Sequence, residues 1–426
     1  MIKIYKHFSL ILTSILLFTA CSIKEPENTT PIKPDDIELL ASSAKDESID
    51  SQKASKDFFE KYFKPWNASK VSTSKIEAMW GHSYKSKQIY LENHQLATTQ
   101  WFDKQIENSN FDSYNTLAKK AITLKNTNVR VLPTNSVMFY DPNTPGEGFP
   151  FDYNQNSAIK INTPIIISHL SKDKAWAYME SSTVSGWVEI GSIAFVDKNF
   201  IQEFKTSNYF VSVKEKFPIY DPIFREYVKV ATIFPKKDDK YIIAKEDDNQ
   251  NAIISYIDLN SQEVEPMPLT FNTENRVKIA KQLMDEPYGW GGLLNNRDCS
   301  SFTQDYFATF GKYLHRNSKA QLSNGNYLDM SNLSNDEKKE FMKKNAVPFS
   351  TLVYLKGHIM MYIGVKDNEP LVMHNMWSVR LKDSSGKKYR HIIGKATITT
   401  LEPGKAIKDF DEETNILNRI QGIVIL

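Results

Sequence analysis

Residues 286–311, EPYGWGGLLNNRDCSSFTQDYFATFG, are the stretch from which the organisation of the chain can be worked out. The first half reads as a glycine-containing turn, and the second half has the apolar spacing of a helix. The apolar side chains of this helix are Phe302, Tyr306, Phe307 and Phe310. Gly311 is placed to end it. The segment therefore predicts a turn that leads into a helix with Cys299 at its start.

A thiol at the start of a helix meets unpaired backbone N–H groups and the positive end of the helix dipole, which favour the thiolate. The thiolate is the form that attacks carbonyl carbon. On residue type alone, a lone cysteine beside phenylalanines is more often a small buried hydrophobe. Asp298 and Ser300, however, flank Cys299 with polar groups. We therefore interpret Cys299 as a candidate nucleophile.

Two histidines follow on a predicted hairpin. Residues 358–365 predict one strand, 366–368 a turn and 371–377 the return strand. His358 begins the first strand and His374 lies in the second. A cysteine nucleophile needs an imidazole base and a third polar group that orients the ring. The two histidines can fill these roles, although either one alone could equally be a structural side chain.

The register of this hairpin tests the interpretation. A symmetric four-residue loop from Lys366 to Glu369 would set His374 opposite Met361, with the two rings on opposite faces. A three-residue loop, with Asn368 in the left-handed conformation, would set His374 opposite Met360 and place both rings on one face. We predict the second arrangement, or a bulge of equal effect.

The motifs Tyr288-x-Trp290-Gly291-Gly292, Asp298-Cys299-Ser300, Gly357-His358 and finally His374 occur in this order. In this order they resemble the NlpC family of papain-like cysteine peptidases, which cut bacterial cell-wall peptides. The resemblance covers residues 269–426 and implies a catalytic triad of Cys299, His358 and His374. It implies oxyanion donors from the Cys299 backbone N–H and the Tyr288 hydroxyl. One departure is Ser301, where the family commonly has glycine.

The N-terminus has the pattern of a targeting segment. Lys3 and Lys6 precede an apolar run that is short for a membrane span, so residues 1–20 are predicted to be a signal peptide. The sequence around Cys21 resembles a lipobox, which implies acylation of Cys21, although Phe18 replaces the usual leucine. Ordinary secretion is the alternative.

Composition supports an exported protein with a single functional thiol. Residues 21–50 are rich in Pro, Ser, Thr and acidic side chains and predict a flexible tether. Cys21 and Cys299 are the two cysteines, so acylation of the first leaves one free thiol. The net charge is +2, with both signs interleaved, which argues against nucleic acid or another polyanion as a partner.

The region between tether and peptidase predicts three further units, in a multidomain α+β fold. Residues 51–128 are mostly helical, and an aromatic stripe from Phe58 to Trp66 is interpreted as a packing face. Residues 129–197 and 198–268 each consist of short β-like runs separated by Pro, Gly, Asn and Asp. Residues 269–426 form the peptidase unit.

This layout resembles the NlpC subgroup with an N-terminal helical clip and two SH3-like barrels, whose members are γ-D-glutamyl-L-diamino acid endopeptidases. In that subgroup the clip limits access to the site. The first barrel supplies an acid and a tyrosine that hold the free amino group of the substrate. The resemblance implies Glu147 as the acid and Tyr178 as the tyrosine, with Tyr153 as the second choice. The remaining expected substrate contacts are Asp298, Ser300 and Ser318.

The expected function is hydrolysis of the γ-D-Glu to L-diamino acid bond in murein stem peptides that have a free N-terminal L-Ala. The resemblance implies no metal and no organic cofactor. We expect a monomer that is exported and held to the cell envelope through its lipid alone. The alternatives are a non-catalytic peptidoglycan-binding lipoprotein, or an amidase or acyltransferase on the same fold. A zinc site is a further alternative, built from Cys299, His358, His374 and Asp298.

Overall fold

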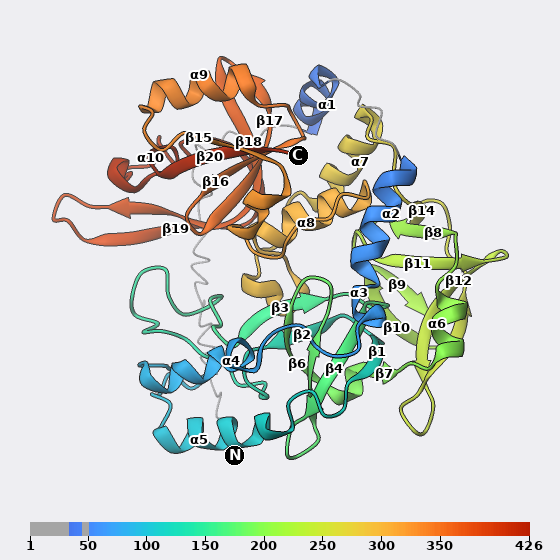
Figure 1. Cartoon of the computed structure of the whole chain (residues 1–426). Helices are drawn as coiled ribbons and strands as arrows, with labels where there is room; N and C mark the ends of the chain where they lie inside the picture. The colour runs from blue at the N-terminus through green and yellow to red at the C-terminus, as the bar shows by residue number, and fades with distance from the viewer. Residues whose placement is uncertain (1–33, 45–50) are drawn as a thin grey trace, which may run out of the picture.

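The computed structural model describes residues 34–44 and 51–426, which form a helical region, two β units and a C-terminal α+β unit (Figure 1). The predicted signal peptide, Cys21 and much of the predicted tether lie outside the described residues. Among the helices that the structure describes, none combines the length and the apolar character needed to cross a membrane.

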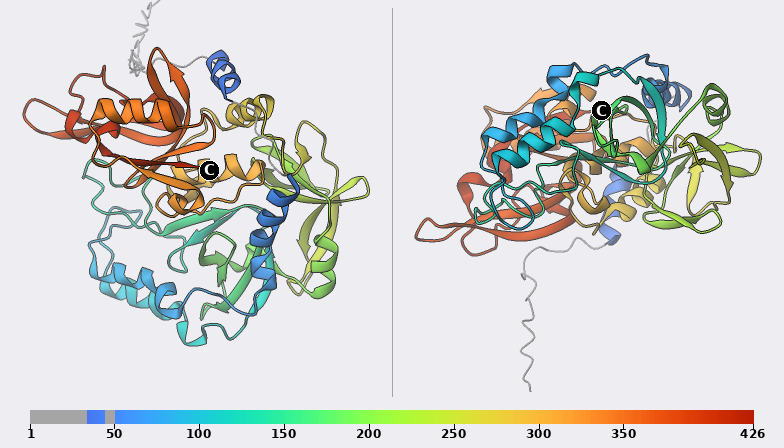
Figure 2. Two further views of the ribbon diagram at one scale, coloured as in Figure 1. Left: turned by 45° about the horizontal axis from the view of Figure 1, so that its top comes forward. Right: turned by 90° about the horizontal axis from the view of Figure 1, so that it is seen from below.

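The helical region packs mainly against the first β unit, and its later helices lie beside that unit in both views of Figure 2. Its elements are α1 (Pro34–Ser43), α2 (Ser51–Tyr62), α3 (Lys64–Asn67), α4 (Lys75–Ala78), α5 (Thr99–Asn108) and the 3₁₀ turns η1 (Trp80–Ser86) and η2 (Phe111–Ser113). The predicted aromatic stripe is a packing face. The Trp66 indole N–H donates to the Ala121 carbonyl at 2.8 Å, and Phe59 stacks on Tyr209 of the second β unit.

The first β unit begins ten residues earlier than predicted, at Lys119, because β1 pairs with both β4 and β7. Its strands are β1 (Lys119–Thr123), β2 (Thr127–Arg130), β3 (Gln155–Ile159), β4 (Pro164–Leu170), β5 (Trp176–Glu180), β6 (Ser185–Glu189) and β7 (Ile193–Phe195), with η3 (Ile190–Ser192) before β7. They form one sheet in the order β3-β2-β6-β5-β4-β1-β7.

The second β unit follows one short helix and contains two sheets. Its elements are α6 (Lys198–Phe204), β8 (Tyr209–Ser212), β9 (Phe217–Tyr220), β10 (Phe224–Val228), β11 (Ile233–Lys237), β12 (Lys240–Glu246), β13 (Ala252–Ile257) and β14 (Val264–Pro266). The larger sheet has the order β13-β12-β11-β8-β14, and β9 pairs with β10. Two β units in tandem were predicted, and both are present.

The C-terminal unit is a six-stranded antiparallel sheet with helices on both faces. Its helices are α7 (Thr273–Leu283), α8 (Cys299–Thr309), α9 (Asn335–Asn345) and α10 (Ile416–Arg419), with 3₁₀ turns η4 (Trp290–Asn295), η5 (Ala320–Asn324) and η6 (Glu412–Thr414). Its strands are β15 (Asn326–Asp329), β16 (Thr351–Leu355), β17 (His358–Lys366), β18 (Glu369–Lys382), β19 (Lys388–Thr400) and β20 (Ile420–Ile425), in the order β15-β20-β16-β17-β18-β19.

Helix α8 occupies the middle of the molecule, with the C-terminal sheet on one side and the first β unit on the other (Figure 1). Its phenylalanines pack on Ile359 and Met361 of β17, whereas Met342 of α9 packs on Met360, from the opposite face. The residue alternation of one strand therefore supplies both cores. The predicted helix and hairpin of this unit are confirmed.

The glycine pair of the turn before α8 is explained by contact with the first β unit. Gly291 and Gly292 have φ of +56° and +88°, which favour glycine. A Cβ on Gly291 would lie 2.4 Å from the Gln155 carbonyl oxygen, and one on Gly292 would lie 2.6 Å from the Ala158 Cβ. The two glycines thus let η4 lie directly on β3.

Part of the predicted tether is not flexible. Residues 34–43 form α1, which packs on α7 and β17 of the C-terminal unit, as Figure 1 shows. Ile37, Leu40 and Ala41 form a buried face on this short helix. Acidic residues on either side of that face pair with the C-terminal unit: Glu38 with Lys281 and Asp36 with Lys366. The polar composition of residues 34–43 led to the prediction of a tether, although the segment contains three apolar residues that form one face of a helix.

We expect Leu40→Ala to detach α1, because the Leu40 side chain is 4% exposed and lies against the sheet at Gly364. The free energy that holds α1 on the C-terminal unit should fall by about 2–5 kcal/mol, the usual cost of removing a buried leucine side chain. Leu39→Ala is the matched control, since Leu39 is 68% exposed. Proteolytic cleavage within residues 34–44 should become faster in the first variant alone. Equal cleavage rates in the two variants would contradict this packing.

Candidate active site

Asp298 caps the helix that carries the candidate nucleophile. Its carboxylate accepts the Ser301 backbone N–H at 2.8 Å, and its own N–H donates to the Ser301 hydroxyl at 3.0 Å. This reciprocal capping box satisfies two backbone donors at the start of α8. Ser301, the departure from the family pattern, therefore tightens the helix start directly after Cys299.

The two histidines share one face, as predicted, but through a bulge, which was the alternative, and not through the three-residue loop. Lys366 pairs with Glu369 across a two-residue turn, and this register alone would set His374 opposite Met361. An irregularity between Tyr362 and Gly364 shifts the register by one, so that Met361 pairs with Met373. The rings consequently meet, with His358 Nε2 lying 2.7 Å from His374 Nδ1.

The hydrogen bonds of a threonine at the end of the histidine pair indicate which ring nitrogens carry protons. The Thr399 hydroxyl donates to the Thr400 carbonyl at 2.7 Å, so its oxygen accepts from His374 Nε2–H at 3.1 Å. His374 Nδ1 is then unprotonated and accepts from His358 Nε2–H. This leaves Nδ1 of His358 without a proton, as a base requires.

The thiol lies where β17 and β18 separate. Their pairing begins at Met361, so Ile359 has no partner on β18. The Ile359 backbone N–H instead donates a hydrogen bond to the Cys299 sulfur, which acts to lower the pKa of the thiol. His358 precedes Ile359 at the start of the same strand. The sequence-predicted Cys299, His358 and His374 thus come from α8, β17 and β18 to one end of the sheet.

Burial outweighs the helix dipole at the sulfur. Cys299 is 8% exposed, and burial, followed by the Asp298 carboxylate, raises the pKa of its thiol to about 12. Burial, followed by Arg419, lowers the pKa of His358 to about 4. Burial therefore opposes the expected thiolate, and both pKa shifts favour the neutral groups. A neutral thiol stands with a neutral imidazole, because neither charge is well solvated there.

Asp298 is paired with an arginine that the sequence interpretation did not single out. Arg316 Nη2 donates to Asp298 Oδ2 at 2.7 Å and Nη1 to Oδ1 at 3.1 Å. Although burial acts to raise the pKa of Asp298, Arg316 lowers it overall. Arg316 also donates to the hydroxyls of Ser300 and Ser157. The predicted acid is therefore already neutralised within the protein.

A cleft of about 350 Å³ opens beside the thiol, between the helical region, the first β unit and the C-terminal unit. Of the predicted residues, it is lined by Tyr153, Tyr288, Asp298, Cys299, Ser300 and Ser318. Burial and the nearby Cys299 raise the pKa of Tyr288 well above its ordinary range, so its hydroxyl stays a donor. Trp80, Tyr84 and Trp290 add an aromatic wall that the sequence analysis did not assign.

The first-choice tyrosine, Tyr178, is not at this cleft. It is buried against Phe111, Trp187 and His169, in the core that the first β unit shares with the helical region. The second choice, Tyr153, lines the cleft and donates its hydroxyl to Glu147 Oε2 at 3.0 Å. Tyr153 therefore replaces Tyr178 as the partner of Glu147.

The zinc alternative does not fit these contacts. Within the described residues, no group of three or more His, Cys, Asp or Glu side chains is arranged to hold a metal ion. Both carboxylate oxygens of Asp298 accept hydrogen bonds from Arg316, and the two histidine rings are hydrogen-bonded to each other.

Comparisons with known proteins agree with this division into units. A profile for the NlpC/P60 family matches residues 285–394, one for an SH3 domain (SH3b1 type) matches 138–189, and one for the N-terminal NLPC_P60 stabilising domain matches 10–114. A search of curated proteins gives no match. For the second β unit, an SH3-like fold stays a prediction.

Among solved structures, an NlpC/P60 endopeptidase from Photobacterium damselae subsp. piscicida has a TM-score of 0.81 at 26% identity, over 90% of this chain and 94% of that one. An NlpC/P60 family protein from Bacillus cereus ATCC 10987 has a TM-score of 0.45 at 14% identity, over 72% and 98%. The family profile and the site geometry fall on the same unit: residues 285–394 carry an NlpC/P60 domain, and the chain resembles an NlpC/P60 endopeptidase over 90% of its length.

Proposed function

We propose that this chain is a cysteine endopeptidase that cleaves the γ-D-Glu to L-diamino acid bond of murein stem peptides. Members of the NlpC/P60 family are in general cysteine peptidases that act on peptidoglycan. The observation that carries the proposal is the 2.7 Å contact between His358 and His374, on the strands beside the start of α8. It supplies an oriented base next to a thiol that lines a cleft.

The proposed reaction starts from neutral groups. As the Cys299 sulfur attacks the γ-carbonyl carbon, its proton passes to Nδ1 of His358. The imidazolium that forms is stabilised by His374, whose Nδ1 accepts the Nε2–H of His358. The negative charge on the carbonyl oxygen is met by the Cys299 backbone N–H and the Tyr288 hydroxyl.

Collapse of this intermediate breaks the carbon–nitrogen bond. His358 gives its proton to the departing amine of the diamino acid, and a thioester to Cys299 remains. Water then attacks the thioester with His358 again acting as the base, which releases the γ-carboxylate and restores the thiol. No step requires a redox partner.

Selectivity for a free N-terminal L-Ala is proposed to rest on Glu147 and Tyr153. Asp298 is neutralised by Arg316, so it offers an incoming ammonium little net charge. Glu147 accepts a hydrogen bond from Tyr153, which lines the cleft, and is proposed as the acid that meets the amine. An ammonium that leaves water needs such a carboxylate.

Export and lipid anchoring through Cys21 are likewise proposed, from the sequence of residues 1–21.

The decisive test compares L-Ala-γ-D-Glu-diaminopimelate with its N-acetylated form as substrates. We expect the free peptide to be cut at the γ-D-Glu bond, and Cys299→Ala to abolish cleavage. Glu147→Gln should lower kcat/KM for the free peptide by about tenfold or more and leave that for the acetylated peptide unchanged. Full activity of Cys299→Ala would refute the proposed mechanism, and a binding-only lipoprotein would cut neither peptide.

The pKa of the thiol can be read from its alkylation by iodoacetamide, in a full-length Cys21→Ser variant with one thiol. Because burial raises the pKa of Cys299 to about 12, the thiolate fraction should grow about tenfold per pH unit between about pH 6 and 9. An alkylation rate that stays constant with pH below about pH 7 would show a preformed thiolate–imidazolium pair. This result would contradict the neutral resting form.

Thr399→Val should weaken the orientation of His374, because it removes the acceptor for Nε2–H. Loss of one such hydrogen bond predicts a fall in kcat of about fivefold with little change in KM. Thr397→Val is the matched control, since Thr397 lies on the same strand and face but its hydroxyl donates to the Ile398 carbonyl. Equal kcat values for the two variants would remove Thr399 from the relay.

A further inference from the structure

A buried group of charges joins the two β units to the nucleophile segment. Its members are Lys160 of the first unit, Glu215 and Lys229 of the second, and Arg297 and Asp305 of the C-terminal unit. Arg297, Glu215 and Asp305 have side chains that are 2%, 5% and 6% exposed. Arg297 and Lys160 pair with the two carboxylates, and charges this deeply buried persist only when they are paired.

Arg297 is the centre of this group. Its Nη1 and Nη2 donate to the two carboxylate oxygens of Glu215 at 2.8 and 2.9 Å, and its Nε donates to Asp305 Oδ2 at 2.7 Å. A bidentate arginine–carboxylate contact fixes direction as well as distance. Arg297 is therefore held in one orientation between the second β unit and the middle of α8.

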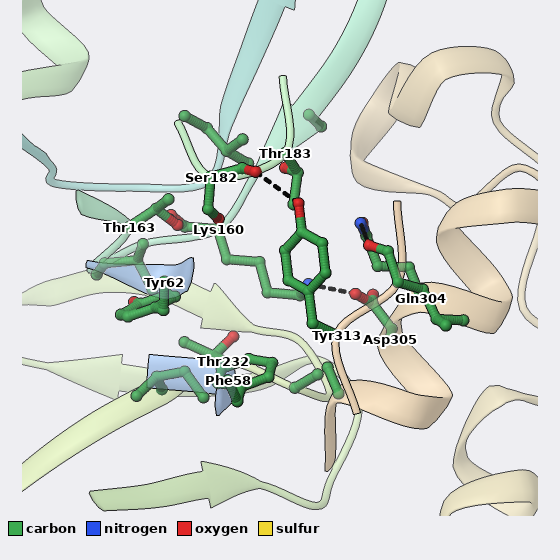
Figure 3. A pocket seen from close by; sticks show the side chains of 17 residues that line it. Phe58, Tyr62, Lys160, Thr163, Ser182, Thr183, Thr232, Gln304, Asp305 and Tyr313 are labelled. Atoms are coloured by element: carbon green, nitrogen blue, oxygen red, sulfur yellow. Dashed lines mark hydrogen bonds and ion pairs between the residues drawn. The ribbon is translucent and has the colours of Figure 1, made fainter. Parts of the chain in front are cut away.

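Lysines from both β units complete the arrangement. Figure 3 shows Lys160 reaching Asp305 at a cavity of about 90 Å³, where α2, the β units and α8 meet. Lys229 donates to the Asn295 carbonyl, two residues before Arg297. Burial, followed by Arg297, lowers the pKa of Lys229 to about 7, which reflects how little water reaches the group.

The main chain of Arg297 is hydrogen-bonded to segments next to the proposed triad residues. Its carbonyl accepts from the Asn375 side chain at 2.9 Å, and Asn375 directly follows His374 on β18. The same carbonyl accepts the Gly289 backbone N–H at 2.8 Å. Asp298 and Cys299 come next in the chain. A shift of Arg297 would thus change the position of the thiol relative to the histidine pair.

We propose that Glu215 is a positioning residue for Cys299: from the second β unit it clamps Arg297, and so holds the start of α8 in register with the histidine strands. The inference rests on the proposed peptidase function. It gives the second β unit a task in the reaction, although none of its residues lines the cleft beside the thiol.

The competing explanation is that this contact only holds two units together, and a second ion pair tests it. Glu265 on β14 pairs with Lys278 on α7 at 2.6 Å, so it joins the same two units away from the nucleophile segment. If Glu215 only joins units, Glu215→Gln and Glu265→Gln should both lower the thermal midpoint and leave kcat unchanged.

The experiment compares these two variants as full chains, well below their melting temperatures, with active enzyme counted by thiol titration. Glu215→Gln should lower kcat by about tenfold or more with KM within about threefold, because a displaced nucleophile slows the chemical step more than binding. Glu265→Gln should change neither by more than about twofold. An unchanged kcat for folded Glu215→Gln would overturn the inference.

Alkylation of Cys299 by iodoacetamide gives a readout that needs no substrate. Because burial is the largest cause of the raised thiol pKa, release of the helix start in Glu215→Gln should increase the alkylation rate by about threefold or more. Faster alkylation in Glu215→Gln but not in Glu265→Gln separates release of the helix start from a general loss of stability, which would expose the thiol in both variants. If the unaltered chain cuts no peptide, the proposed function fails, while the alkylation comparison still decides the role of Glu215.

Arg297→Lys keeps the positive charge but cannot make the bidentate contact with the Glu215 carboxylate. This variant tests the proposal if Glu215→Gln does not fold. We expect a similar loss of kcat. The double variant should be no slower than the slower single variant, because both changes break one contact. Losses that multiply would show two independent effects and contradict the proposed clamp.

Discussion

The carboxylate of Asp298 is the contact on which the site depends. It caps α8 through Ser301, accepts the Gly291 backbone N–H at 3.1 Å and forms a two-point ion pair with Arg316. A buried carboxylate without these partners would cost several kcal/mol or become protonated. The hydrogen bonds to the Asp298 carboxylate hold the turn, the start of α8 and one wall of the cleft together, directly beside the sulfur.

The units around this point share the work of placing the thiol. The first β unit meets η4 so closely that only glycine fits at Gly291 and Gly292, and it contributes Tyr153 to the cleft. The sheet supplies the histidine pair from adjacent strands, and its bulge brings the rings together. Because the cleft has walls from three units, its shape is set by how they dock as much as by the catalytic unit itself.

Burial explains the chemical character of the site. The same packing that orients Cys299 and His358 removes water from them, so each is favoured in its neutral form. The relay from Thr399 through His374 then matters because it places the proton on Nε2 of His358 and leaves Nδ1 available. In the proposed mechanism, orientation of His358 by hydrogen bonds therefore replaces a preformed thiolate–imidazolium pair.

Elements with local signals could be predicted from the amino-acid sequence: the helix from Cys299, the histidine hairpin, the two β units and the aromatic packing stripe. Periodicity and turn residues carry such information within a few positions of the chain. The bulge, too, followed from requiring both histidines on one face. The order of Cys299, His358 and His374 was likewise sufficient to nominate the triad residues.

Features that depend on residues far apart in the chain became visible in the folded molecule. Tyr178 and Tyr153 are both tyrosines of the first β unit, and the docking of that unit determines which one reaches the cleft. Arg316 neutralises Asp298 from 18 residues away, and burial reverses the expected effect of the helix dipole on the thiol. Pairing and desolvation are set by whatever surrounds a group in space, and this information is absent from its neighbours in the chain.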